Sequence, residues 1–342
     1  MDTTTLIDTA VAIVCAGKGI LAADESTSTI GKRFDGIDTL STEATRRAYR
    51  ELLFTSPGME QYISGVILYD ETLRQCAADG TPFPKLLSDK GVLPGIKVDA
   101  GVHDLAGFPG ETVTEGLDGL RQRLHEYAGL GARFAKWRAA INVDTATGLP
   151  TAGGIEANAH ALARYAALCQ EAGVVPIVEP EVLMDGSHDI AACEAATAAT
   201  LASVFAVLRA QRIVLEGIVL KPNMIVSGKD CPAQSEVDEV AQATIRVFRR
   251  LVPAAVPGIA FLSGGQSPQI ATAHLNAMNG LGPLPWELTF SYGRALQETT
   301  LQTWCGEETR VGAAQLEFLL RARLNSAARS GSYTEEMERT AA

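Results

Sequence analysis

The sequence predicts an α/β fold, a (β/α)8 TIM barrel, and three observations support this prediction. Eight short apolar segments have the character of buried strands. Stretches of helical periodicity separate most of them, and this alternation is typical of a parallel sheet, which eight units close into a barrel. Charged and hydroxyl side chains follow nearly every strand segment, and barrel enzymes carry their active sites at that face.

Nothing in the chain resembles a linker, so we expect a single domain over residues 1–342. The barrel itself is expected at about 19–300. A weak helical pattern over 1–18 predicts an N-terminal helical extension, and a C-terminal helix and tail are expected at about 311–342.

Each predicted strand is a short, mostly apolar run that ends beside glycine, proline or a charged residue. The strands are expected at residues 19–27, 64–70, 93–99, 133–138, 174–181, 215–220, 258–265 and 286–294. Helices are expected at residues 41–54, 155–172, 195–208, 237–251 and 311–329.

Two of the helical stretches carry additional features. One helix should begin at a capping box, Thr112-x-x-Glu115, because the following residues recur at helical spacing: Leu117, Leu120, Leu124 and Tyr127. The helix at 41–54 presents three arginines on a polar face, where we expect them to be solvated or structural: Arg46, Arg47 and Arg50.

Lys221 follows the apolar segment 215–220 and precedes Pro222. Proline cannot donate a hydrogen bond to a sheet and holds the preceding residue in extended backbone, so Lys221 should lie where a strand leaves the barrel. An amine held there, partly removed from water, keeps a larger neutral fraction and can attack a carbonyl to form a Schiff base. The alternative is that Lys221 is the first solvated residue of a loop.

Three carboxylates and a second lysine lie at the ends of other predicted strands. Lys136 would place a cation near Lys221 and favour the neutral form of that amine. Glu179 and Glu181 share one face of their strand and can accept and donate protons, and Asp24 is a third candidate carboxylate. We predict that these residues are catalytic; the alternative is that Glu179 and Lys136 form a structural ion pair.

Two groups of residues near strand ends predict anion binding. Ser263-Gly264-Gly265 and Gly293-Arg294 follow the last two strands, where barrels often bind phosphate through backbone N–H groups. A second group lies past the first and third strands and offers hydroxyls and cations: Ser26, Thr29, Lys32, Arg33 and Lys97. Unless that second group is a solvated basic turn, the substrate carries a carbonyl between two phosphates.

The composition argues against several classes of protein. A net charge of −11 disfavours a general binder of nucleic acid or of anionic membranes. The six cysteines show no structural-zinc spacing, so we expect no metal site and reduced thiols in a cytoplasm. The N-terminus lacks the pattern of a signal peptide, and the uncharged stretch 195–208 is short enough to predict a buried helix rather than a membrane span.

Six ordered motifs within about residues 17–335 make the sequence resemble class I fructose-bisphosphate aldolases. The motifs are GILAADEST at 19–27, FAKWR at 134–138, VEPE at 178–181, LKPNM at 220–224, FLSGGQS at 261–267 and LTFSYGRAL at 288–296.

The resemblance implies a role for each matching residue. Lys221 would form the Schiff base with the C2 ketone of fructose 1,6-bisphosphate, Glu179 would transfer protons, and Glu181, Lys136 and Asp24 would tune and orient. One phosphate would be held by Ser263, Gly264, Gly265, Ser291, Gly293 and Arg294. The other phosphate and the sugar chain would be held by Ser26, Arg33, Lys97 and Arg138, with Thr29 standing where the family commonly has serine.

The family's chemistry sets further expectations. Cleavage would give dihydroxyacetone phosphate and glyceraldehyde 3-phosphate in glycolysis and, in reverse, gluconeogenesis. No metal or other cofactor would be needed, because the imine is the electron sink. The resemblance also implies a cytoplasmic homotetramer whose partners are small sugar phosphates, not nucleic acid or membranes.

One departure from the family pattern concerns the C-terminus. Many relatives end in a tyrosine that assists late proton transfer, whereas this chain ends in Thr340-Ala341-Ala342 and its last tyrosine is Tyr333. This leaves open the choice between fructose 1,6-bisphosphate and fructose 1-phosphate.

Two alternative functions compete with this one. Another Schiff-base barrel, such as a transaldolase or a deoxyribose-phosphate lyase, is disfavoured by two phosphate subsites. A non-catalytic interaction protein on an aldolase scaffold is disfavoured by the intact set of Lys221, Glu179 and Lys136.

Overall fold

The computed structural model describes residues 3–339 and contains a closed barrel of eight parallel strands. The predicted (β/α)8 fold is therefore confirmed, and each predicted strand overlaps one barrel strand. In barrel order the strands are β1 (Gly19–Ala23), β10 (Glu287–Tyr292), β9 (Gly258–Phe261), β8 (Val219–Leu220), β7 (Val175–Val182), β6 (Phe134–Ile141), β3 (Leu93–Lys97) and β2 (Ile63–Leu68).

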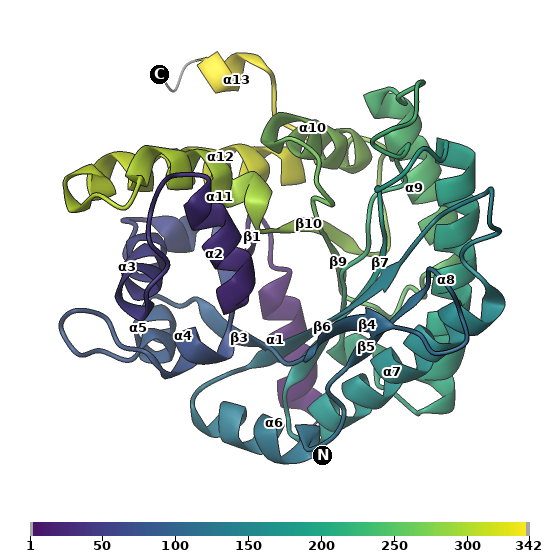
Figure 1. The fold of residues 1–342 in the computed structure, drawn as a ribbon, viewed down its shortest axis with the longest axis horizontal. Helices are drawn as coiled ribbons and strands as arrows, with labels where there is room; N and C mark the ends of the chain where they lie inside the picture. The colour runs from purple at the N-terminus through teal and green to yellow at the C-terminus, as the bar shows by residue number, and fades with distance from the viewer. Residues whose placement is uncertain (1–2, 340–342) are drawn as a thin grey trace.

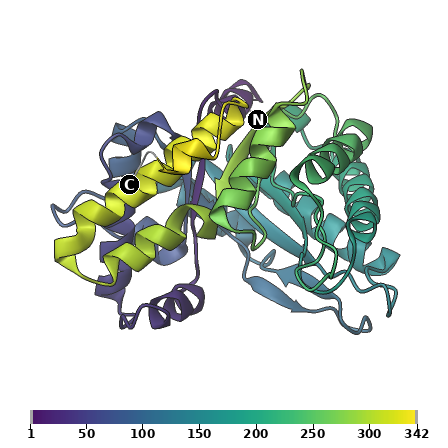
Figure 2. The ribbon, with the colours of Figure 1, turned by 90° about the horizontal axis from the view of Figure 1, so that it is seen from above.

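Helices surround the barrel on its outer side, apart from α1, which covers one end of it (Figure 1). They are α1 (Thr3–Ile13), α2 (Thr27–Asp35), α3 (Glu43–Phe54), α4 (Asp70–Arg74), α5 (Phe83–Asp89), α6 (Leu120–Gly129), α7 (Ala152–Glu171), α8 (Ile190–Ala210), α9 (Val237–Leu251), α10 (Pro268–Asn279), α11 (Arg294–Trp304), α12 (Val311–Arg329) and α13 (Glu336–Arg339). The long helix α12 packs against α10 and α11, so the C-terminal part of the chain lies on one side of the barrel (Figures 1 and 2).

The N-terminal helix α1 closes the amino-terminal end of the barrel. Its side chains, including Leu6 and Val14, are buried together with inward-facing strand residues such as Phe134 and Ile177. Gly217 permits this approach, because a Cβ there would lie 2.5 Å from Leu6 Cδ2. The barrel interior is therefore apolar at this end, and its polar side chains are left to the carboxyl-terminal end.

The predicted capping box at Thr112-x-x-Glu115 is wrong. These residues form strand β5 (Thr112–Glu115), which pairs with β4 (Gly101–Asp104) as an antiparallel hairpin outside the barrel. The hydroxyls of Thr112 and Thr114 point to one side of the strand and donate to the carbonyls of Ala140 and Arg138, at 2.9 and 2.6 Å. The helix begins only at Leu120, after Gly119 in left-handed backbone.

Helix α8 contains the alanine-rich stretch predicted at 195–208. On length and composition alone it could cross a membrane, and it is the only helix in residues 3–339 to pass that test. In the fold it packs against α7, α9 and β7, with Leu201, Val204 and Leu208 buried. It therefore serves as one of the outer helices of the barrel.

Candidate active site

A cavity of about 780 Å³ opens at the carboxyl-terminal end of the barrel. All sixteen residues predicted for catalysis or phosphate binding line it. Most of them lie at or beyond the carboxyl end of a strand, and parallel strands present these ends at one face, whereas Lys136, Arg138 and Glu179 lie within the longer strands β6 and β7. The exception among the weaker candidates is Lys32, which is exposed on α2 and does not line this cavity.

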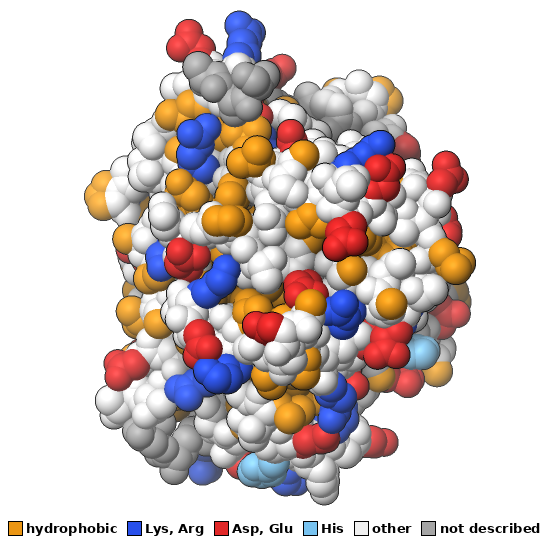
Figure 3. Space-filling model, turned by 90° about the vertical axis from the view of Figure 1, so that its left-hand side faces the viewer, with side chains coloured by type: hydrophobic (Ala, Val, Ile, Leu, Met, Phe, Trp, Pro, Cys, Tyr) orange, Lys and Arg blue, Asp and Glu red, His pale blue; other side chains and the backbone are white. Residues whose placement is uncertain are grey.

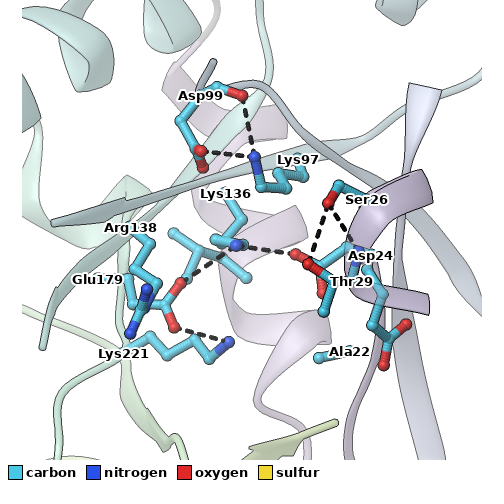
Figure 4. Close-up of polar contacts among 12 residues, drawn as sticks. Ala22, Asp24, Ser26, Thr29, Lys97, Asp99, Lys136, Arg138, Glu179 and Lys221 are labelled. Atoms are coloured by element: carbon cyan, nitrogen blue, oxygen red, sulfur yellow. Dashed lines mark hydrogen bonds and ion pairs between the residues drawn. The ribbon is translucent and has the colours of Figure 1, made fainter. Parts of the chain in front are cut away.

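Four charged side chains, three buried and Asp24 partly buried, form a connected cluster at the floor of the cavity (Figure 4). Lys221 Nζ lies 3.0 Å from Glu179 Oε1, and Lys136 Nζ lies 3.5 Å from Glu179 Oε2. Lys136 Nζ also lies 2.8 Å from Asp24 Oδ2. Two ammonium groups therefore face two carboxylates, and this balance lets all four be removed from water together.

The cluster keeps Asp24 and Lys136 charged. Burial raises the pKa of Asp24, but the charges of Lys136 and Lys221 outweigh burial and hold that pKa well below its usual range. Burial lowers the pKa of Lys136, yet Asp24 and Glu179 outweigh it and raise that pKa above its usual range. Lys136 is thus a permanent cation beside Glu179 at neutral pH.

The backbone around Lys221 is held from both sides. Strand β8 is only two residues long, and the Lys221 amide donates to Val178 O at 2.8 Å. Beyond it, the Leu262 amide donates to Pro222 O at 3.2 Å, and the Val182 amide donates to Asn223 Oδ1 at 3.0 Å. The side chain of Asn223 thus replaces the missing strand pairing where the chain turns away after Pro222.

The other predicted catalytic carboxylate, Glu181, belongs to a second ion pair. It contacts Arg138 on the neighbouring strand β6, and Arg138 lies opposite Glu179 in the strand register. Lys97 contacts Asp99 in a third pair near the cavity wall (Figure 4). Asp99 was missed from sequence, although its position two residues after Lys97 would place both on one strand face.

The loops after β9 and β10 form one polar rim of the cavity. Gly264 and Gly265 have φ values of 58° and 94°, a backbone region that glycine adopts without a steric penalty. Ser291 Oγ is buried and has no hydrogen-bond partner among the described residues. Arg294 is exposed at the first turn of α11, so its guanidinium and the helix N-terminus face the same space.

The loop after β1, the strand beside β10, forms a second rim. Ser26 caps α2, and its hydroxyl lies 3.0 Å from that of Thr29, so the threonine keeps the hydroxyl contact that serine would make. Arg33 follows one turn later and reaches back to Glu25. Lys97 completes this rim from β3.

Comparison with known proteins agrees with this geometry. A family model described as fructose-bisphosphate aldolase class-I matches residues 5–342. The chain belongs to the class I fructose-bisphosphate aldolase family. It is thus an enzyme, a glycolytic aldolase and carbon–carbon lyase, and the function predicted from sequence is confirmed.

Similar proteins come from several kingdoms. A probable fructose-bisphosphate aldolase class 1 of Xanthomonas campestris pv. campestris is 57% identical, over 96% of this chain and 98% of that protein. Fructose-bisphosphate aldolase 5, cytosolic, of Arabidopsis thaliana is 56% identical over 96% and 91%. A solved fructose-bisphosphate aldolase from Plasmodium falciparum, in complex with TRAP and a small-molecule inhibitor, superposes with a TM-score of 0.96 at 49% identity, covering 97% and 95% of the two chains.

The family acts on sugar phosphates, and its class I members use a Schiff base rather than a metal. Residues 3–339 contain no group of three or more histidine, cysteine, aspartate or glutamate side chains placed to hold a metal ion. Tyr333, the last tyrosine, is buried, and its hydroxyl donates to Glu338 at 2.9 Å instead of lining the cavity.

Proposed function

We propose that Lys221 is the residue through which this aldolase forms its Schiff base with the C2 ketone of fructose 1,6-bisphosphate. The observation that carries this proposal is the 3.0 Å contact between Lys221 Nζ and Glu179 Oε1, both buried at the floor of the cavity. Glu179 can take the proton that the ammonium must lose before the amine attacks the ketone.

The same carboxyl group is placed to move the later protons. It returns a proton to the carbinolamine oxygen, which leaves as water when the imine forms. It then takes the proton of the C4 hydroxyl as the C3–C4 bond breaks and the electron pair moves into the protonated imine. Glyceraldehyde 3-phosphate leaves, the enamine is protonated at C3, and hydrolysis releases dihydroxyacetone phosphate.

The neighbouring residues have supporting roles in this proposal. Lys136, as a permanent cation, stabilises the carboxylate of Glu179 and the oxygen that develops negative charge. Asp24 holds Lys136 at 2.8 Å. Glu181 orients Arg138 toward the sugar chain through their ion pair. No metal or other cofactor is required, because the protonated imine accepts the electron pair.

The order of the strands suggests how the two phosphates bind. Carbon 1 is bonded to the C2 ketone, so its phosphate must bind close to Lys221. The loop after β9, the strand beside β8, is the nearest rim, and we assign that phosphate to Ser263, Gly264, Gly265, Ser291, Gly293 and Arg294. The phosphate on carbon 6 is then left to the rim formed after β1 and β3, at Ser26, Thr29, Arg33 and Lys97.

We also propose that residues 1–342 act as one domain in a cytoplasmic homotetramer that binds neither nucleic acid nor membranes. The cytosolic designation of the Arabidopsis relative supports the location. The tetramer is proposed from the family resemblance alone. The net charge of −11, and the mixture of positive and negative side chains on the face drawn in Figure 3, support the absence of a polyanionic partner. Light scattering coupled to size exclusion tests the tetramer.

Borohydride reduction in the presence of dihydroxyacetone phosphate, followed by peptide mass mapping, tests the central assignment. We expect one covalent adduct, on the peptide that contains Lys221. An adduct on Lys136 instead, or folded protein without any adduct, would contradict the assignment. A parallel substrate panel with monophosphate sugars separates this aldolase from other Schiff-base lyases and measures the preference that the C-terminal departure leaves open.

A further inference from the structure

A second cluster of buried charges lies behind the carbon 6 rim. Glu25 follows Asp24 in the chain, and its side chain is only 5% exposed. One carboxylate oxygen pairs with Arg33, and the other lies 2.6 Å from Arg50 Nη2. Gln297 Nε2, from α11, donates to Glu25 Oε1 at 3.2 Å. One carboxylate thus holds two guanidinium groups.

The two arginines differ in what they can reach. Arg33 is partly exposed and lines the cavity, whereas Arg50 comes from α3, has a side chain 3% exposed and does not line the cavity. Arg50 therefore cannot contact a substrate held there. A buried arginine that serves only to pair with a carboxylate is costly, so its charge needs another explanation.

The net charge of the cluster of Glu25, Arg33 and Arg50 provides that explanation. Glu25 alone would neutralise Arg33, and the pair would offer a phosphate little net attraction. With Arg50 on the second oxygen the cluster keeps a net charge of +1. Of its two guanidinium groups only that of Arg33 lines the cavity, next to Glu25. Burial raises the pKa of Glu25, but Arg50 and Arg33 outweigh it and lower that pKa, so the carboxylate stays ionised at neutral pH.

We propose that Glu25 and Arg50 are positioning residues for the carbon 6 phosphate: Glu25 fixes the guanidinium of Arg33 at the rim, and Arg50 offsets the carboxylate so that Arg33 keeps its positive charge for the substrate. The inference rests on the proposed binding of that phosphate by Arg33. Together the two residues determine how strongly the enzyme prefers fructose 1,6-bisphosphate to fructose 1-phosphate, which lacks that phosphate.

The test compares kcat/KM for the two substrates in purified full-length variants. In Arg50→Gln we expect kcat/KM for the bisphosphate to fall about tenfold further than kcat/KM for fructose 1-phosphate, mainly through KM. Arg50→Lys keeps the charge and should restore most of the preference. Glu25→Gln keeps the shape of the side chain, is the second variant should Arg50→Gln not fold, and should also lower the preference. A merely structural role would change both substrates equally.

Two further variants separate the possible failures. Arg46→Gln, on the same helix but paired with Glu71, controls for loss of a partly buried, ion-paired arginine in α3 and should leave the preference unchanged. Arg33→Ala reports on the proposed phosphate site. If Arg33→Ala lowers the preference while Arg50→Gln and Glu25→Gln do not, this inference is overturned and the phosphate site stands. If Arg33→Ala leaves the preference unchanged, both are overturned.

Discussion

The floor and the rims of the cavity differ in their balance of charge. At the floor, Lys136 and Lys221 are matched by Asp24 and Glu179, and all four are at most about one-eighth exposed. At the rims, Arg294 is exposed without a described ion pair, and Arg33 keeps a positive charge through the Glu25–Arg50 pair. The reacting groups therefore exchange protons among themselves, while the rims leave surplus positive charge for the substrate's phosphates to neutralise.

Replacement of the nucleophile Lys221, at the floor of the cavity, should have the largest effect on activity. Lys221→Met should reduce cleavage by about 10⁴-fold or more, because no other amine can form the Schiff base at that place. The fold should be retained, because Glu179 keeps Lys136 as a charged neighbour at 3.5 Å. Steady-state kinetics and thermal unfolding check the two halves of this prediction. Near-normal turnover in the variant would remove Lys221 from the mechanism.

The proton carrier comes next in expected effect. Glu179→Gln should lower kcat by about 10²–10⁴-fold, because the amide can neither accept the proton of the C4 hydroxyl nor return it. Borohydride trapping should slow in parallel, since carbinolamine formation needs the same group. Glu181→Gln is the matched control: it removes a carboxylate paired with Arg138, away from Lys221, and should cost kcat far less. Equal losses in the two variants would contradict the assignment.

A rim substitution should show the opposite kinetic pattern. Arg294→Ala should raise KM about tenfold or more while kcat changes little, since the arginine contributes binding rather than proton transfer. Because we assign Arg294 to the carbon 1 phosphate, the increase should be similar for fructose 1,6-bisphosphate and fructose 1-phosphate. Arg310→Ala removes an exposed arginine paired with Glu307, outside the cavity, and should change neither constant.

The smallest expected effect concerns the support of the rim after β9. His274 on α10 is buried, and its Nδ1 lies 2.6 Å from Gln266 Oε1, in the loop that follows Ser263. Burial lowers the pKa of His274 to about 4. Between pH 6.5 and about 4, His274 is therefore protonated in the unfolded chain but neutral in the folded chain. The free energy of unfolding falls as pH falls through that window.

Urea unfolding across that window measures the effect. The loss should be on the order of 3 kcal/mol at most. In His274→Gln this part of the pH dependence should disappear, while the contribution of the paired carboxylates, which titrate at lower pH, remains in both proteins. An unchanged slope in the variant would show that His274 is not the group responsible.

The match between sequence and structure is closest where the signal is local. Alternating residues on a strand share a face, so the pairs Lys136–Arg138 and Glu179–Glu181 were expected to project together. The proline after Lys221 marked the end of β8, and the structure has that end one residue before the lysine. The pattern failed at 112–115, because a four-residue run with threonines can be a helix cap or a strand, and pairing with β4 selects the strand.

The residues that sequence reasoning missed depend on contacts between distant segments. Arg50 was interpreted as part of a solvated or structural helix face, yet it is buried against Glu25, 25 positions earlier. No sequence pattern marks Asn223 beyond its place after Lys221 and Pro222. Its role follows from its contact with Val182, whose amide donates to its side chain.

The sequence by itself determined the barrel, because strand and helix periods are local properties that eight repetitions turn into one closed sheet. It also determined which chemical groups lie at the carboxyl-terminal end of the barrel, because strand ends can be recognised in the sequence. Only the tertiary structure decided which charges pair. Glu25 meets Arg50 and Gln297, the latter 272 positions away, because α2, α3 and α11 pack together, and no local pattern encodes which helices pack together.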